Sequence, residues 1–122
     1  MTQQEFLKLI VKALDSKRAE DIQVLHVEDL TILGDYFVIA SGGSTTQTRT
    51  LADEVEYQAS KVGKEPLHRE GRGNGSNWIV LDYGDVIVHI FYKETRSFYQ
   101  LERLWADGDP VDISAWVKPD KI

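Results

Sequence analysis

The sequence predicts a single α/β domain in which a mixed sheet of about five strands is flanked by helices. Stretches with apolar residues at helical spacing alternate with short runs rich in β-branched residues. At 122 residues the chain has the length of one ordinary domain, and its 42% hydrophobic and 28% charged content is typical of globular proteins. Alternation of this kind favours helices that pack on the faces of one sheet.

Three helices are predicted. The first is amphipathic and runs from Thr2 to about Lys17, because apolar residues recur there every three or four positions. The second begins at Ser44, which together with Gln47 has the spacing of a capping box, and it ends at Gly63. The third runs from Glu94 to Trp105 and carries its own apolar stripe.

Five segments rich in β-branched or alternating apolar residues are predicted to be strands. They are Asp21–Val27, Tyr36–Ala40, Glu65–Glu70, Trp78–Asp82 and Val86–Tyr92. Pro66 lacks a backbone N–H and so places its strand at an edge, while Gly84 predicts a hairpin between the last two strands. Asp29–Asp35 and Gly71–Asn77 are expected to be irregular connections.

The predicted element order is α-β-β-α-β-β-β-α, and the order of strands within the sheet does not follow from the sequence. Residues 1–107 are expected to form the domain. Residues 108–122 show no clear period and are expected to form a C-terminal tail.

Composition and charge limit the classes of function. The chain has no cysteine, no apolar run long enough to span a membrane and no secretory signal pattern, so a cytoplasmic protein is expected. Its formal net charge is -6 and its pI is near 5.0. Because phosphate backbones repel such a chain on average, a basic protein surface suits it better than direct nucleic-acid readout. Taken alone, the charge favours a plainer interpretation, in which it only keeps the protein soluble.

The segment Ser41–Thr45, where a predicted strand passes into a helix, is a candidate for an anion site or a serine nucleophile. Backbone N–H groups at a helix N-terminus attract anions. However, the segment lacks the lysine of a P-loop and the glycine spacing of a dinucleotide fingerprint, and Ser44 lacks a nucleophile elbow. A plain helix cap is the favoured interpretation.

Asp82, Asp85 and His89 are the remaining candidates for metal binding or acid–base chemistry. Along a strand, Asp85 and His89 are separated by about 13 Å, with an apolar residue between them. A nucleotidyltransferase-like enzyme that uses Ser44 and magnesium is an alternative, but such sites usually need two acids alternating on one strand. The sequence has no Asp-x-Asp in a predicted strand. We therefore expect no catalytic residues, metal or cofactor.

Aromatic and acidic residues near the predicted hairpin suggest a docking surface instead. Trp78 opens a strand, Tyr83 lies at the hairpin tip between two acids, and Tyr99 lies with Glu102 away from the apolar stripe of the last helix. Aromatics ringed by carboxylates often anchor a basic partner. The same residues equally fit a plain interpretation, in which Trp78 covers the core edge, Tyr83 fills a turn and the acids are solvated.

Several segments together resemble the ribosomal silencing factors, also called the Iojap-like family. The block Trp78–Phe91 resembles the family signature Trp-x-x-x-Asp-x-Gly-Asp-Val-x-Val-His almost letter for letter. The resemblance extends in order over most of the chain, from about Ala19 to Trp105. The other segments that resemble family motifs are Gly34–Gly42, Leu51–Asp53, Glu70–Gly71 and Arg96–Trp105.

This resemblance implies a protein without catalysis or cofactor that binds the fourteenth protein of the large ribosomal subunit. Binding there would block joining of the small subunit and so repress translation. On this implication the aromatic and acidic residues become the docking face. A separate alternative is a homodimeric adaptor in which the aromatic patch is the dimer interface. The residues expected to bind the partner are Glu70, Trp78, Asp82, Tyr83, Asp85, Tyr99 and Glu102.

Overall fold

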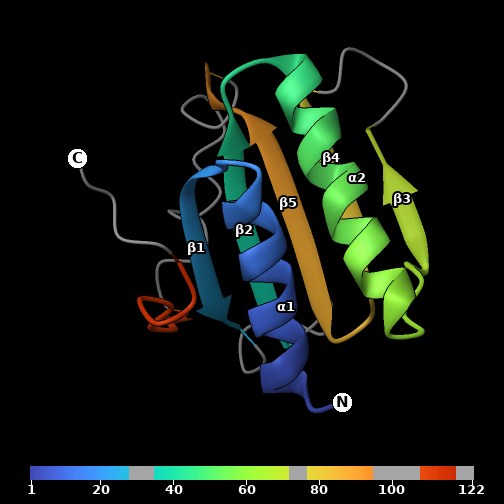
Figure 1. Ribbon diagram of the computed structural model, residues 1–122. Coiled ribbons are helices and arrows are strands. Elements are labelled where there is room, and N and C mark those ends of the chain that lie inside the picture. Colours follow the sequence, from blue (N-terminus) through green and yellow to red (C-terminus); the bar gives the residue numbers. More distant parts are fainter. Residues whose placement is uncertain (28–34, 72–76, 95–107, 118–122) are drawn as a thin grey trace.

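The computed structural model describes residues 1–27, 35–71, 77–94 and 108–117, which form one sheet with two helices (Figure 1). The strands are hydrogen-bonded in the order β3-β4-β5-β2-β1-β6. β2 and β5 are parallel, and the other neighbouring pairs are antiparallel, so the prediction of an α/β domain with a mixed sheet is confirmed. The elements are α1 Gln3–Ser16, β1 Glu20–His26, β2 Tyr36–Gly42, α2 Thr45–Lys61, β3 His68–Glu70, β4 Trp78–Asp82, β5 Val86–Tyr92 and β6 Asp109–Pro110.

The sheet has six strands where about five were expected. The additional strand, β6, consists of Asp109 and Pro110 in the expected tail, and it pairs with Leu25 and His26 of β1. Because Pro110 has no N–H to donate, it is suited to the edge of a sheet. Two residues are too few to show a periodicity, so only the neighbouring strand identifies them.

The described part of the tail is attached to the domain. The N–H of Val111 donates to the carbonyl of Val24 at 2.8 Å, and Trp116 packs partly buried against the core. The boundary expected at residue 107 stays a prediction, and residues 108–117 contact the sheet and the core through these interactions. The third predicted helix lies outside the described residues except for Glu94.

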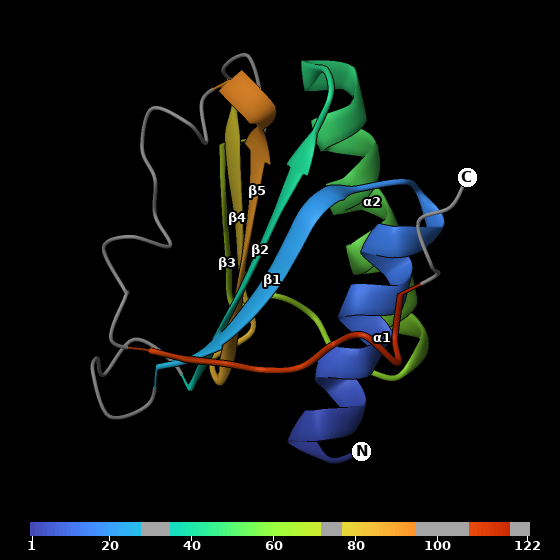
Figure 2. The same ribbon diagram turned by 90° about the vertical axis from the view of Figure 1, so that its left-hand side faces the viewer.

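The two described helices cover the same face of the sheet (Figure 2). Their apolar stripes and the facing strand residues form a core in which most side chains are fully buried, since burial of apolar surface drives this packing. The opposite face carries a second buried cluster. Its members are Leu25, Val27, Phe37, Ile39, Ile87 and Phe91. β2 is therefore buried on both faces, as its continuous apolar run predicts.

The helix starts confirm one part of the predicted capping and correct another. Ser44 caps α2 by accepting the N–H of Gln47 at 3.0 Å, which confirms the cap interpretation of this segment. The Gln47 side chain was expected to bond back to Ser44. It donates instead to the carbonyl of Lys17 and so links the start of α2 to the end of α1. A complete capping box is present at Thr2 and Glu5 of α1.

Candidate docking surface

Trp78 lies on the sheet face that α1 and α2 do not cover. This face also carries His89 and Phe91, and we call it the Trp78 face. Its indole is half-buried and stacks on the ring of Phe91, with centroids 5.0 Å apart and an interplanar angle of 24°. The indole N–H donates to Nδ1 of His89 at 3.2 Å. Trp78 is thus seated on the sheet by two aromatic neighbours and still exposes part of its surface.

His89 lies in β5 and is 8% exposed. It is opposite Val80 of β4, and its ring lies 4.8 Å from that of Phe37. Burial disfavours the charged imidazolium, and so it lowers the pKa of His89 to about 4. His89 is therefore neutral near pH 7. Because Nδ1 accepts the indole N–H, the ring proton is on Nε2.

The structure does not assemble an acid–base or metal site from Asp82, Asp85 and His89. Asp82 is opposite Ile87 across the hairpin, and Asp85 precedes β5. Both are therefore displaced along the sheet from His89. Among the described residues, no group of three or more His, Cys, Asp or Glu side chains is arranged to hold a metal ion.

Glu70 lies in the edge strand β3 and is exposed. It is opposite Val80, so it shares the sheet face of Trp78 and is its diagonal neighbour. The following residue, Gly71, has φ of +94°, and a Cβ added to it would lie 1.9 Å from the carbonyl oxygen of Trp78. Only glycine permits this approach, which brings Glu70 next to the start of β4.

Asp82 and Asp85 lie in or beside the turn between β4 and β5. Asp82 Oδ1 accepts the N–H of Gly84 at 2.8 Å, and Gly84 has the positive φ of +90° expected for this turn. Asp85 is exposed, while its backbone carbonyl accepts the N–H groups of Asp35 and Tyr36. The two carboxylates therefore combine a local structural role with a negative charge at one end of the sheet.

Tyr83 lies at the turn, as predicted, but it is only partly exposed, and its contact with a partner stays a prediction. Its ring packs edge-on against Phe6 of α1, with centroids 5.1 Å apart and an interplanar angle of 81°. Its hydroxyl is buried and has no hydrogen-bond partner among the described residues. Burial raises the pKa of Tyr83. Tyr83 belongs to the helix side of the sheet, where α1 covers a residue that the sequence places at a turn.

The predicted docking residues therefore fall into two groups. Glu70 and Trp78 lie at one end of β4, and Asp82 with Asp85 lies at the other. Trp78 and Asp82 are four positions apart along β4, which corresponds to about 13 Å. A partner that contacts both groups must span most of the strand. Tyr99 and Glu102 lie outside the described residues.

Leu67 is an exposed residue that the sequence interpretation missed. It is 68% exposed, and its N–H donates to the carbonyl of Asp82 at 2.7 Å. A Cβ added to Gly84 would lie 3.5 Å from Cδ1 of Leu67, so this exposed leucine lies beside the turn between β4 and β5. The sequence feature that could have indicated this exposed residue is a single leucine between Pro66 and His68 in a polar stretch.

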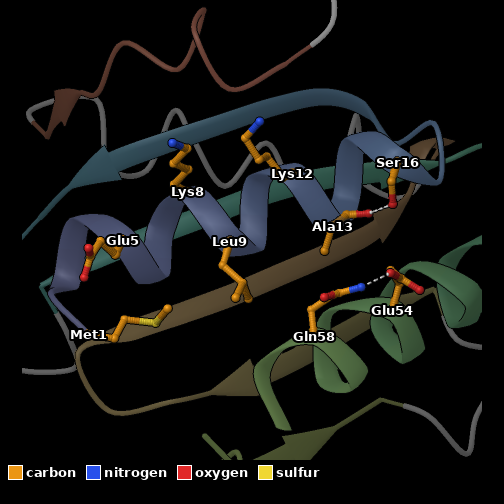
Figure 3. A pocket seen from close by; sticks show the side chains of 9 residues that line it. All are labelled: Met1, Glu5, Lys8, Leu9, Lys12, Ala13, Ser16, Glu54 and Gln58. Carbon is orange, nitrogen blue, oxygen red and sulfur yellow. Dashed lines mark hydrogen bonds between the residues drawn. The ribbon is translucent and has the colours of Figure 1, made fainter. Parts of the chain in front are cut away.

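A groove of about 510 Å³ lies between α1 and α2, on the helix side of the molecule (Figure 3). Leu9 and Ala13 contribute apolar surface to it. Three of its polar side chains pair locally: Gln58 Nε2 donates to Glu54 at 2.8 Å, and the Ser16 hydroxyl donates to the carbonyl of Ala13. Because these groups do not converge on the groove, we assign no ligand to it.

Comparison with known proteins places these features in a family. The family model described as "Ribosomal silencing factor during starvation" matches residues 1–121. The Bacillus subtilis protein named "Ribosomal silencing factor RsfS" is 41% identical over 113 residues, which cover 93% of this chain and 95% of the relative. The maize protein "Protein Iojap, chloroplastic" is 32% identical over 112 residues, covering 88% of this chain and 46% of that protein.

Solved structures agree with this result. A crystal structure of a Chromobacterium violaceum protein superposes with a TM-score of 0.83 at 30% identity, covering all of this chain and 92% of that one. A Bacillus halodurans structure gives 0.79 at 36% identity, covering 90% of this chain and 99% of that one. None of the described helices has the length and apolar character needed to cross a membrane. Given the match to the family model and the similar sequences, the chain belongs to the ribosomal silencing factors, a family of ribosome-associated regulators of translation that are not enzymes.

Proposed function

We propose that this protein represses translation in the cytoplasm by binding the large ribosomal subunit through its fourteenth protein. Bound at the face where the small subunit docks, it prevents the two subunits from joining. The observation that carries the proposal is the family match over residues 1–121. The alternative of a nucleotidyltransferase-like enzyme is set aside, because the family is not enzymatic.

Charge and shape support a basic protein partner. The formal net charge of -6 favours approach to a basic surface and disfavours contact with bare RNA. Trp78 offers a half-buried aromatic surface, with Glu70 beside it at the rim. Leu67, Asp82 and Asp85 offer an apolar and acidic surface at the other end of β4. Lysine or arginine side chains of the partner would pair with these acids.

Repression in this proposal is steric. A domain of 13.9 kDa at the joining face occupies volume that the small subunit needs. A specific interface of about 800 Å² per partner is enough to hold such a domain in place. No chemical step is required, so the degree of repression follows the fraction of large subunits that are occupied.

Co-sedimentation with isolated large subunits tests the docking step, and a subunit-joining assay tests its consequence. Trp78→Ala should weaken co-sedimentation by at least about 30-fold, the loss expected for an aromatic hot spot. Tyr57→Ala is the matched control, because Tyr57 is 58% exposed on α2, on the other side of the sheet. If wild type stays in the supernatant at low salt, the docking proposal is refuted. If Trp78→Ala unfolds by circular dichroism, Trp78 is a core residue.

The acidic groups are tested by charge removal without loss of shape. Asp82→Asn combined with Asp85→Asn keeps an oxygen that can accept the N–H of Gly84. This variant should bind more slowly and with a weaker dependence on salt. Glu20→Gln, an exposed residue at the start of β1, serves as the charge control. If both variants associate with the large subunit at equal rates, the turn is not part of the interface.

A homodimer of the free protein is the other use proposed for the aromatic patch. Light scattering of wild type and Tyr99→Ala measures it directly. If wild type scatters as a monomer, the homodimer proposal fails while the docking proposal is unaffected.

A further inference from the structure

The orientation of Trp78 depends on a hydrogen bond from the neighbouring strand. Trp78 lies in β4, and His89 lies in the antiparallel strand β5 opposite Val80, so the two side chains are diagonal neighbours on one face. The indole N–H donates to Nδ1 of His89 at 3.2 Å while the indole ring stacks on Phe91. Stacking depends little on where the ring lies in its own plane, whereas the directional N–H bond favours one position of the indole.

Burial of the His89 imidazole on this face is energetically unfavourable. It is 8% exposed, and its Nε2 has no hydrogen-bond partner among the described residues. With Nδ1 acting as acceptor, Nε2 carries a proton that is desolvated and unpaired. An apolar side chain would avoid this cost, and the neighbouring Phe37 and Phe91 show that the face accepts apolar rings. The gain that offsets the cost is the bond from Nδ1 to Trp78.

We propose that His89 is a positioning residue for docking, which holds the indole of Trp78 against Phe91 so that its exposed surface is preorganised for the ribosomal partner. This inference rests on the proposed function and adds a residue that does not itself contact the partner. An aromatic side chain that is already fixed in the free protein loses less conformational entropy on binding. The smaller entropy cost increases the affinity.

Two substitutions at position 89 separate the hydrogen bond from the packing. Leucine and asparagine have the same branched shape, but only asparagine carries an oxygen near the position of Nδ1. His89→Leu therefore leaves the indole N–H without its acceptor, while His89→Asn restores one. Circular dichroism checks that both fold. If His89→Leu does not fold, His89→Gln replaces it. The glutamine amide lies one bond further from the backbone than that of asparagine, so its oxygen lies beyond the position of Nδ1.

The first measurement is the indole N–H signal of Trp78 in the ¹H–¹⁵N spectrum of the free protein. The chain has three tryptophans, and Trp78→Phe identifies the signal that belongs to Trp78. His89→Leu should move this signal and speed its exchange with water, whereas His89→Asn should keep it protected. The second measurement is co-sedimentation with large subunits. His89→Leu should weaken binding roughly 2- to 10-fold, the range for loss of one hydrogen bond, and His89→Asn should stay near wild type.

A double-substitution cycle completes the test. In a Trp78→Phe background there is no indole N–H to hold, so His89→Leu should have no additional effect on binding. The inference is overturned if His89→Leu binds like wild type, if His89→Asn binds as weakly as His89→Leu, or if His89→Leu weakens binding equally in both backgrounds. Failure of wild type to sediment would instead refute the proposed function, and the positioning role would fall with it.

Discussion

Acidification should destabilise this protein through His89, and replacement of that residue should remove the effect. The imidazole is buried on the Trp78 face, and the aromatic side chains in contact with it, which include Trp78, Phe37 and Phe91, carry no charge. Burial lowers its pKa from 6.5 to about 4. The unfolded chain therefore binds a proton at a pH where the folded protein does not, and proton binding to the unfolded state favours unfolding.

The sign and size follow from these two values. The stability is fully present above pH 6.5 and is lost as the pH falls towards the folded pKa of about 4. One pKa unit corresponds to about 1.4 kcal/mol, so the loss due to His89 is about 2 kcal/mol at pH 5 and about 3 kcal/mol at pH 4. Below that value both states are protonated, and the contribution of His89 no longer changes.

Urea denaturation of wild type and His89→Asn at pH 7, 5 and 4 measures this contribution. Carboxylates also titrate in this range, but they are common to both proteins, so the difference between the two pH profiles isolates position 89. The free energy of unfolding of wild type should fall more steeply than that of the variant, by the amounts above. Parallel profiles would show that His89 is as easily protonated in the folded state as in the unfolded one, which would refute the burial argument.

Two further predictions concern backbone space and a buried hydroxyl. Gly63→Ala and Gly71→Ala both place alanine at positive φ, but nothing lies within 4 Å of a Cβ at Gly63, whereas a Cβ at Gly71 meets the Trp78 carbonyl at 1.9 Å. Gly63→Ala should lower the free energy of unfolding by about 1 kcal/mol. Gly71→Ala should lower it by roughly 1–3 kcal/mol more and should also weaken docking. Equal losses of the two variants in urea denaturation would contradict the close approach at Gly71. Tyr83→Phe removes a buried hydroxyl that has no partner among the described residues. It should be neutral or stabilise the protein by up to about 1 kcal/mol in thermal denaturation, and a clear loss of stability would reveal a partner for that hydroxyl.

Local features of the chain could be predicted from the sequence because their causes are local. The run Tyr36–Ala40 is continuously apolar and forms a central strand buried on both faces. Ser44 caps a helix through its own side chain, and Gly84 takes the positive φ that its short turn requires. The family resemblance rests on the block Trp78–Phe91 and the segment Arg96–Trp105, because the family signature specifies seven residues within the twelve positions Trp78–His89.

Contacts between distant segments could not be predicted, because they depend on register and on which element covers which face. β6 exists only beside β1, and Gln47 turns to Lys17 because α1 ends near it. Tyr83 is half-buried because Phe6, far away in the chain, packs against its ring. Trp78 and His89 become partners through the pairing of β4 with β5.

The residue pattern thus determines the class of fold, the family and the residues that are candidates for docking. Packing determines which of those candidates remain exposed and how Trp78 is held. The physical reason is that helical periods, caps and turns depend on neighbours within a few residues, whereas burial and cross-strand bonds depend on neighbours that only the folded chain brings together.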